Sequence, residues 1–416
     1  MRKRSLPLTW PPKAWSSEPL PDPMTAVGQG VPGGRGWVRN RVLGLLVIGA
    51  IGAALSLAFV TVAPNRLVSG SAVPLQSLMV AAPWGLWAAA TVLVIAVFMP
   101  ATQLTQVAVA MAAALLFAGL AGLAGSEAAR RSAGLPALAR VSLGGGFWLM
   151  LLMAWLAFAD ALQRLDLSLG WRSLAHAVLL VPLVWLVGAG ALDQLSLLKE
   201  YANRDETFHA AGLRHLQIVL AALAPSLLIG LPLGVAAARS DRVAKPLLAL
   251  LNLVQTMPSI ALFALLIGPL SALAAALPGW GLSGIGLLPA AVALTLYALL
   301  PIVHGMSSGL RQVPAAVLAA AAGMGMTPRQ RLWRVELPLA LPVLLSALRV
   351  TTVQVIGLAV VAALIGAGGF GARVFQGLAS SAIDLVLLGV LPVLALAAVA
   401  DAGFALLIVA WAGPQR

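Results

Sequence analysis

Long apolar runs alternate with short polar segments along most of this chain. Each run is close to the ~20 residues that an α-helix needs to cross the ~30 Å hydrocarbon core of a bilayer. Strands of a transmembrane barrel alternate with period two and would leave no long apolar blocks. The pattern therefore predicts an all-α polytopic membrane protein with about ten transmembrane helices. The predicted spans lie near residues 42–63, 79–99, 104–124, 142–161, 173–191, 215–238, 247–276, 285–306, 337–365 and 385–412.

The composition supports this fold class. Of the 416 residues, 61% are hydrophobic and 9% are charged, which is too few charges for the surface of a soluble protein. The net charge of +13 comes from residues scattered through the loops. That distribution indicates orientation by the positive-inside rule and no nucleic-acid partner. The chain has no cysteine and only dispersed histidines, so we expect no disulfide and no metal site.

Polar segments divide the predicted spans into regions. Residues 1–40 are rich in proline, glycine and basic side chains and predict a disordered cytoplasmic tail, within which Met24 is an alternative start. Residues 41–191 predict an N-terminal membrane region of about five spans, 192–214 an external linker, and 215–416 a second region of five spans. Lysine and arginine concentrate in the loops of one side, which predicts that both termini are cytoplasmic. The loop with Arg130, Arg131 and Arg140 departs from this bias.

The predicted cytoplasmic loop 307–336 has a pattern of its own. "PAAVLAAAA" (314–322) begins with proline and continues in strong helix formers, and glycines then interrupt it. Thr327 can cap a second helix that starts at Pro328, and Gln330 completes a capping box. Two short helices meeting at a glycine corner can dock a partner protein. An amphipathic helix lying on lipid headgroups is the alternative, and the residues alone leave both open.

The same loop resembles the signature of ABC-importer permeases, in which Glu-Ala-Ala is followed by a glycine and then by an apolar-Leu-Pro ending. Ala320 and Ala321 match the alanines and Gly325 the glycine, and the chain departs at Ala319, where the family usually has Glu. The resemblance implies coupling helices that insert into a groove of an ABC ATPase subunit. The coupling-loop residues are Ala319, Ala320, Ala321, Gly323, Gly325, Thr327, Pro328, Arg331, Leu337 and Pro338.

Further blocks resemble one branch of that family. "QTMPSIALFALL" (255–266), "ALTLYALLPIV" (293–303) and "ALIGAGGFG" (363–371) look like permeases that import osmoprotectants such as glycine betaine, choline, carnitine or proline betaine. The resemblance implies that the chain lies in the bacterial inner membrane and has three partners: an ABC ATPase subunit, an external substrate-binding protein, and a second permease copy or paralogue. An extra multi-span N-terminal region resembles one subgroup of the branch, but it carries no motif.

Polar side chains within the spans are candidates for the translocation path. Such groups are costly in a bilayer unless they face water or a partner, although hydrogen bonding between helices explains them as well. We expect high-affinity recognition to reside in the binding protein and the permease to offer a weakly selective path. The candidates are Gln255, Thr256, Pro258, Ser259, Tyr297 and Gln354.

"GAGGFG" (366–371) fits a dinucleotide-binding pattern but lacks the strand, helix and acidic residue which that site needs. It is interpreted instead as an external turn, serving as a gate or as a contact for a delivering protein. The glycines concerned are Gly366, Gly368, Gly369 and Gly371.

Asp401 lies inside the last apolar run, and an intramembrane carboxylate is a functional candidate. It either pairs with a neighbouring helix or serves as the coupling site of an ion- or proton-driven secondary transporter, which is the alternative function. Arg349 is expected to extend to the cytoplasmic surface. A membrane scaffold that docks a signalling protein is a third possibility, but it leaves the polar residues in the spans unexplained.

No nucleotide-binding P-loop occurs in the chain, so we expect no cofactor here and ATP hydrolysis in a separate ATPase. The chain is therefore predicted to be a transport subunit and not an enzyme. Its predicted function is to provide the path for an osmoprotectant through an ATP-driven importer.

Overall fold

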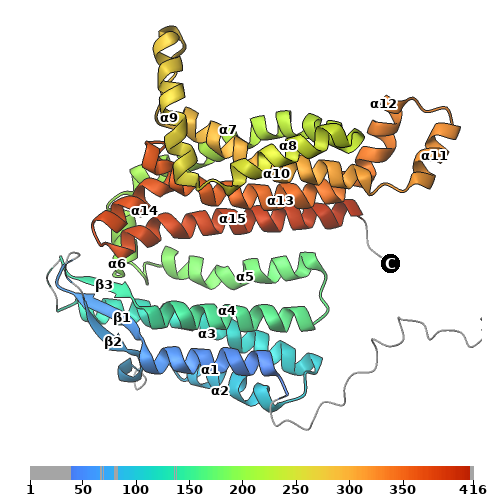
Figure 1. Cartoon of the computed structure of the whole chain (residues 1–416). Helices are drawn as coiled ribbons and strands as arrows, with labels where there is room; N and C mark the ends of the chain where they lie inside the picture. Colours follow the sequence, from blue (N-terminus) through green and yellow to red (C-terminus); the bar gives the residue numbers. More distant parts are fainter. Residues whose placement is uncertain are drawn as a thin grey trace, which may run out of the picture.

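The computed structural model describes residues 39–412 except 66, 67, 69, 79–82, 135 and 137. Almost all of the predicted tail 1–40 lies outside the described residues. The described part forms two helical layers, one below the other in Figure 1. We call them the N-terminal half (residues 39–188) and the C-terminal core (residues 205–412).

Five helices build the N-terminal half, and they lie side by side in the lower layer of Figure 1. Helix α4 packs against both α1 and α3, and α2 packs against α3. The helices are α1 (Arg41–Ser56), α2 (Trp84–Phe98), α3 (Gln103–Ser132), α4 (Gly145–Arg164) and α5 (Leu169–Gly188).

A small antiparallel sheet at one end of these helices shows that the predicted first span, 42–63, is wrong in its last third. Helix α1 ends at Ser56, and the chain continues as strand β1 (Ala58–Ala63), which pairs with β2 (Ser71–Pro74) and β3 (Arg140–Leu143) in the order β2-β1-β3. Aromatic and β-branched residues favour strands, and Phe59 and Val60 are fully buried there. An apolar run read only for its length does not distinguish this strand from a helix.

The C-terminal core begins with helix α7, which starts at Asp205. The predicted linker 192–214 is thus largely helical, because it contains α6 and the first turns of α7. The short helix α6 (Ser196–Ala202) precedes the core. The helices of the core are α7 (Asp205–Arg239), α8 (Asp241–Thr256), α9 (Ser259–Ala276), α10 (Leu287–Arg311), α11 (Ala315–Gly323), α12 (Pro328–Arg331), α13 (Leu337–Val361), α14 (Phe370–Ala379) and α15 (Ile383–Ala412). Short 3-10 turns lie at Leu75–Leu78, Pro278–Trp280 and Ala362–Ile365, and a π-helical turn lies at Leu332–Glu336.

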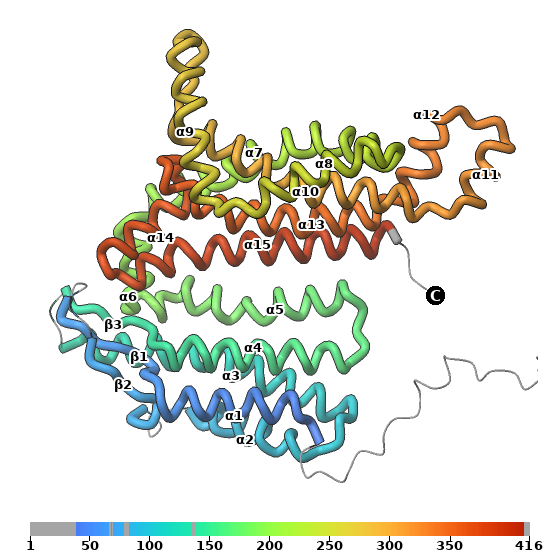
Figure 2. The backbone as a smooth tube through the Cα atoms, viewed as in Figure 1, coloured from blue at the N-terminus to red at the C-terminus, as the bar shows by residue number. Residues whose placement is uncertain are grey.

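Among the described residues, eight helices are long and apolar enough to cross a membrane, and the apolar helices α1 and α2 are shorter, with 16 and 15 residues. The predicted span 247–276 is two helices, because the chain breaks between Thr256 and Ser259. Pro258 lies at this break, where its missing N–H cannot continue a helix. Figure 2 shows α9 turning away from the other helices after the break.

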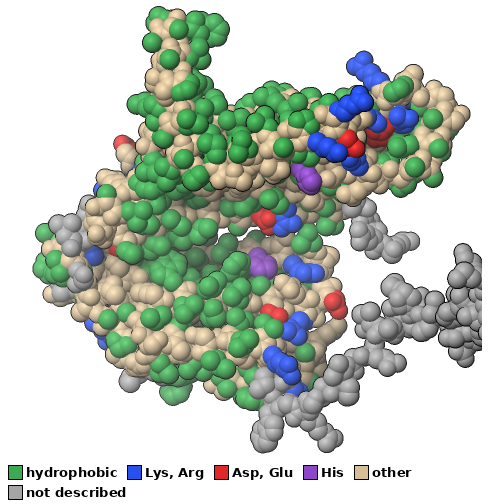
Figure 3. Space-filling model, in the orientation of Figure 1, with side chains coloured by type: hydrophobic (Ala, Val, Ile, Leu, Met, Phe, Trp, Pro, Cys, Tyr) green, Lys and Arg blue, Asp and Glu red, His purple; other side chains and the backbone are tan. Residues whose placement is uncertain are grey.

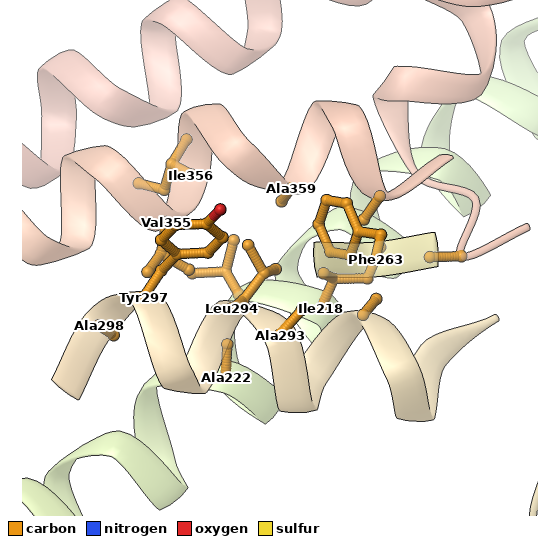
Figure 4. Close-up of a cluster of buried hydrophobic side chains, with 14 of the residues drawn as sticks. Ile218, Ala222, Phe263, Ala293, Leu294, Tyr297, Ala298, Val355, Ile356 and Ala359 are labelled. Atoms are coloured by element: carbon orange, nitrogen blue, oxygen red, sulfur yellow. The ribbon is translucent and has the colours of Figure 1, made fainter. Parts of the chain in front are cut away.

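Small residues let the two central helices of the core approach closely. A Cβ atom on Gly234 of α7 would lie 2.5 Å from the Cβ of Met306 in α10, and one on Gly230 would lie 2.8 Å from Ile302. This glycine spacing is typical of close helix packing in membranes. The contact leads into a buried cluster, shown in Figure 4, where Ile218, Leu294 and Ile356 meet from α7, α10 and α13.

The two halves meet at one end of the molecule. We call this the sheet end (β1–β3, α6 and α14) and the opposite end the loop end (α11 and α12). At the sheet end α15 packs against α6, and the Ser142 hydroxyl donates to Asp384 Oδ2 over 2.6 Å. A hollow separates the layers over the rest of their length on the face shown in Figure 3. The sheet end therefore joins the two halves.

Candidate coupling loop and translocation path

The predicted coupling loop projects beyond the helices at the loop end (Figure 1). Its first helix, α11, ends in a Schellman motif: Met326 N–H donates to Ala321 O over 3.2 Å and Gly325 N–H to Ala322 O over 2.9 Å. Gly325 has φ +78°, in the left-handed region that favours glycine. This glycine therefore sets the sharp turn between the two parts of the loop.

Both hydrogen bonds of the expected capping box are present on the other side of the turn. Gln330 N–H donates to Thr327 Oγ1 over 3.3 Å, and Thr327 N–H donates to Gln330 Oε1 over 2.9 Å, with Pro328 in the first turn. We predicted that the helix after the turn would be short and separate, and this was wrong. The helix continues through the π-helical turn 332–336 into α13, so the loop is joined rigidly to a membrane-spanning helix.

A buried carboxylate anchors the base of this element. Glu336 is 2% exposed and accepts from Arg239 Nη2 over 2.5 Å and from Arg331 Nε over 2.9 Å. Arg239 is the last residue of α7, so the ion pair ties the loop to a second membrane helix. Sequence reasoning named Arg331 but missed Glu336 and Arg239. The only signal was an acidic residue within a basic amphipathic segment, and its partner lies nearly a hundred positions away.

The outer surface of the loop is largely exposed. Ala319 and Ala320 are exposed, whereas Ala321 is buried. Large apolar side chains are exposed beside them, with Met324 at 70% and Trp333 at 61%. In Figure 3 basic and acidic side chains also gather at this end of the molecule. The loop thus presents apolar and basic groups on a rigid support, which suits docking to a protein.

The path candidates around the α8–α9 break have structural partners. Gln255 Nε2 donates to Tyr297 O over 2.8 Å, and the Tyr297 hydroxyl donates to Met257 O over 2.6 Å. These bonds hold the broken segment against α10. Tyr297 is 4% exposed within the hydrophobic cluster, so the prediction that it lines a path is not supported here.

The remaining path candidates are more accessible. Thr256 and Pro258 are exposed, and Ser259 and Gln354 are partly exposed. The Thr256 hydroxyl donates to Leu253 O over 2.7 Å, within its own helix. No described contact joins Gln354 to the α8–α9 break, so these residues remain predictions.

Asp401 pairs with Arg349, and the expectation that Arg349 extends to the cytoplasmic surface stays a prediction. Arg349 Nε and Nη2 donate to the two carboxylate oxygens of Asp401 over 2.5 Å and 2.6 Å. The bidentate pair joins α13 to α15 in the membrane region of the core. Opposite charges in this geometry lower the cost of placing either one in a bilayer. The pairing alternative for Asp401 is thus the one that the structure contains.

The predicted external turn lies at the sheet end. Gly366, Gly368 and Gly369 have φ of +80°, +84° and +72°, which explains why glycine occupies these positions. A Cβ on Gly371 would lie 2.0 Å from Val360 O, so α14 could not approach α13 with a larger residue there. Arg214 Nε donates to Ala367 O over 2.9 Å and fastens the turn to α7.

Within the described residues no group of three or more His, Asp or Glu side chains could hold a metal ion. The candidate sites are the projecting loop 314–336, the break between α8 and α9, and the ion pair of Arg349 with Asp401.

Comparisons with known proteins identify the family. Residues 230–409 match the family model described as binding-protein-dependent transport system inner membrane component, and residues 39–198 match the ABC transporter permease YehY, N-terminal domain. The osmoprotectant import permease protein OsmW of Salmonella typhimurium is 42% identical over 188 residues, which are 45% of this chain and 84% of that protein. The chain belongs to the ABC-transporter permease family.

Other relatives align over the same share of the permease. The choline transport system permease protein OpuBB of Bacillus subtilis is 37% identical over 45% of this chain and 80% of its own length. A chain from a solved structure of the MetNI methionine ABC transporter is 25% identical, with a TM-score of 0.44. The alignment covers 49% of the present chain and 96% of the MetNI chain.

Family membership settles the class of function. The permease is a multi-pass inner-membrane transport subunit and not an enzyme, and its family works with an ATPase and a substrate-binding protein.

Proposed function

We propose that the permease provides the translocation path for a small osmoprotectant, such as glycine betaine or another quaternary amine, delivered by an external binding protein. The support for this substrate class is the similarity to permease proteins for osmoprotectant import, for choline transport and for transport of glycine betaine, carnitine and choline. They match 45–48% of the permease, a length close to that of the C-terminal core. We therefore place the path in the C-terminal core.

The observation that carries the mechanism is the rigid loop anchored by Glu336. We infer that α11 and α12 insert into a groove of the ATPase subunit, where ATP is bound and hydrolysed. Because the loop is continuous with α13 and tied to α7, movement of the ATPase would tilt both helices as one body. This assignment puts the loop end, with the basic residues of segment 327–336, on the cytoplasmic side. It puts the sheet end and the turn 366–371 outside, facing the binding protein.

A second permease copy or paralogue would complete the path. Helix α9 projects from the core in Figures 1 and 2, and its apolar residues Ile260 and Leu265 are 58% and 60% exposed. In α9 only Leu262 and Phe263 are buried, so most of its apolar surface is free to pack against a second permease.

The glycine corner provides the first test. Gly325→Arg is expected to abolish co-purification of the ATPase, because the substitution forces a side chain into a left-handed conformation, at roughly 1–2 kcal/mol, and places a long cation on the docking surface. Gly403→Ala is the control: Gly403 lies in α15, outside the coupling loop, and nothing lies within 4 Å of an added Cβ. Copy numbers of ATPase and permease are compared after gentle-detergent purification. Equal ATPase recovery with Gly325→Arg would refute this docking surface.

Cross-linking tests the second copy. The chain has no cysteine, so single Ile260→Cys, Leu265→Cys or Leu273→Cys variants carry one thiol each. We expect at least one of them to give a covalent permease dimer with a short bis-maleimide in membranes. Val184→Cys in α5, 68% exposed but in the N-terminal half, is the control and is expected to stay monomeric. Dimer formation by the control alone would place the interface elsewhere.

A further inference from the structure

A polar cavity of about 570 Å³ lies at the sheet end, between strand β3 and helix α6, the short helix that packs against α15 of the C-terminal core. We call it the junction cavity. Its wall comes from the first residue of β3, the end of α5, the turn that follows α5, and α6 (Figure 1). Its polar lining includes Arg140, Lys199, Asp193, Tyr201 and Asn203. None of these residues belongs to the coupling loop or to the candidate path.

Positive charge in this cavity is incompletely matched by the protein. The Arg140 side chain is 14% exposed, and its Nε is buried without a hydrogen-bond partner among the described residues. Its Nη2 lies 4.0 Å from Glu200 Oε1, and the same carboxylate also lies 3.6 Å from Arg204 Nε. One carboxylate thus serves two arginines, and the closer of the two pairs is the one with Arg204.

Lys199 adds a second cation to the same wall, and within the described part of the chain it forms no ion pair of its own. Burial, and after it the charge of Arg140, lowers the pKa of the Lys199 ammonium. Two cations near each other, one with an unpartnered donor, favour an anionic ligand between them. A carboxylate is one such anion, because its two oxygens accept hydrogen bonds from a guanidinium and an ammonium group.

The other groups of the lining indicate a second feature of the ligand. Asp193 carries negative charge, and the Tyr201 ring, held edge-on to Phe208 at 5.1 Å between centroids, is partly exposed. A carboxylate and an aromatic ring attract a quaternary ammonium group. The cavity therefore offers groups of both signs, together with an aromatic surface.

We propose that the junction cavity binds a small zwitterion, with its carboxylate held by Arg140 and Lys199 and its ammonium group near Asp193 and Tyr201. The choice of glycine betaine as the specific ligand rests on the proposed function. Because α6 packs against both β3 and α15, a ligand held between α6 and β3 ties the N-terminal half more firmly to the helix that contacts the C-terminal core. The N-terminal half thereby gains a role as part of an accessory substrate site.

The test is calorimetric binding of glycine betaine to the whole purified permease in detergent. Choline carries the same cation without the carboxylate, and acetate carries the carboxylate alone, so both are expected to bind at least tenfold more weakly. Lys199→Gln and Arg140→Gln are each expected to weaken betaine binding about tenfold or more, as the loss of a charged hydrogen bond implies. Arg130→Gln is the control, because Arg130 is 60% exposed, pairs with Glu127 and lies outside the cavity.

Several results would overturn the proposal. If choline bound as tightly as glycine betaine, Arg140 and Lys199 would not be binding a carboxylate, and the proposal would be wrong. Unchanged betaine binding by Lys199→Gln would overturn it as well, because this variant removes no ion pair from the described residues and is expected to fold normally. Phosphatidylcholine nanodiscs test a lipid headgroup, which is also zwitterionic: betaine binding in detergent that disappears in these nanodiscs would assign the cavity to lipid. Binding is read on the permease alone, so a failure of uptake in the assembled importer counts only against the proposed function.

Discussion

Asp401→Asn is expected to lower uptake at least tenfold, and combining Arg349→Asp with Asp401→Arg is expected to restore much of it. The single substitution leaves the Arg349 guanidinium without its bidentate partner within the membrane region, where an unpaired charge at the centre of a helix costs about 2.5–3.5 kcal/mol. The exchanged pair places opposite charges on the same two helices. Uptake and the amount of inserted protein are measured for both single variants and for the double variant.

This experiment separates the ABC mechanism from the ion-driven alternative. If Asp401 carried a proton or an ion during transport, the exchanged pair would insert normally and still fail to transport, since an arginine at position 401 cannot cycle between protonation states. Asp160→Asn is the matched control. Asp160 also pairs with an arginine, Arg164 at 2.8 Å, but within a single helix of the N-terminal half, and its loss is expected to leave uptake nearly unchanged.

Glu336→Gln is expected to uncouple ATP hydrolysis from transport. The neutral amide leaves Arg239 and Arg331 facing each other without a countercharge at a site where the carboxylate is 2% exposed. Loss of one partner from a fully buried ion pair costs about 3–5 kcal/mol. The cost here is smaller, because the side chains of Arg239 and Arg331 are 42% and 27% exposed, but it loosens the base of the loop from α7. We expect uptake to fall at least tenfold while the exposed loop surface still binds the ATPase.

The measurement compares uptake with ATP hydrolysis in reconstituted vesicles, with and without binding protein. In the variant, hydrolysis is expected to lose its response to the binding protein. Arg334→Gln is the control, because Arg334 lies in the same π-helical turn but is exposed and forms no ion pair with a described residue. Wild-type coupling in Glu336→Gln would show that the loop moves α13 without this anchor.

Local signals in the sequence were read correctly where the interaction is local. The capping box joins Thr327 and Gln330, which are three positions apart, and the left-handed turn needs one glycine, Gly325. These three residues therefore predicted the turn of the loop from the sequence. The loop motif and the blocks around residues 255–266 and 363–371 identified the family for the same reason: such motifs are short and contiguous.

Long-range interactions escaped the sequence. Arg349 and Asp401 are 52 positions apart, and Glu336 and Arg239 are 97 apart, so each charge alone suggested only a surface or functional residue. The strand 58–63 looked like part of a span because a buried strand and a buried helix segment are both continuously apolar. Tyr297 was a candidate for the path, but its ring is buried in the hydrophobic cluster and its hydroxyl donates to Met257 O.

The sequence by itself determined that this protein is a helical membrane transporter subunit with a capped helical loop, since hydrophobic length and local capping chemistry are properties of contiguous residues. Only the tertiary structure decided which charges neutralise one another, where the overlong run breaks into α8 and α9, and that Arg140 and Lys199 line one cavity beside α6. Those outcomes depend on which distant helices come within a few ångströms, because the cost of a charge or a polar group in a membrane protein is set by its partner and not by its position in the chain.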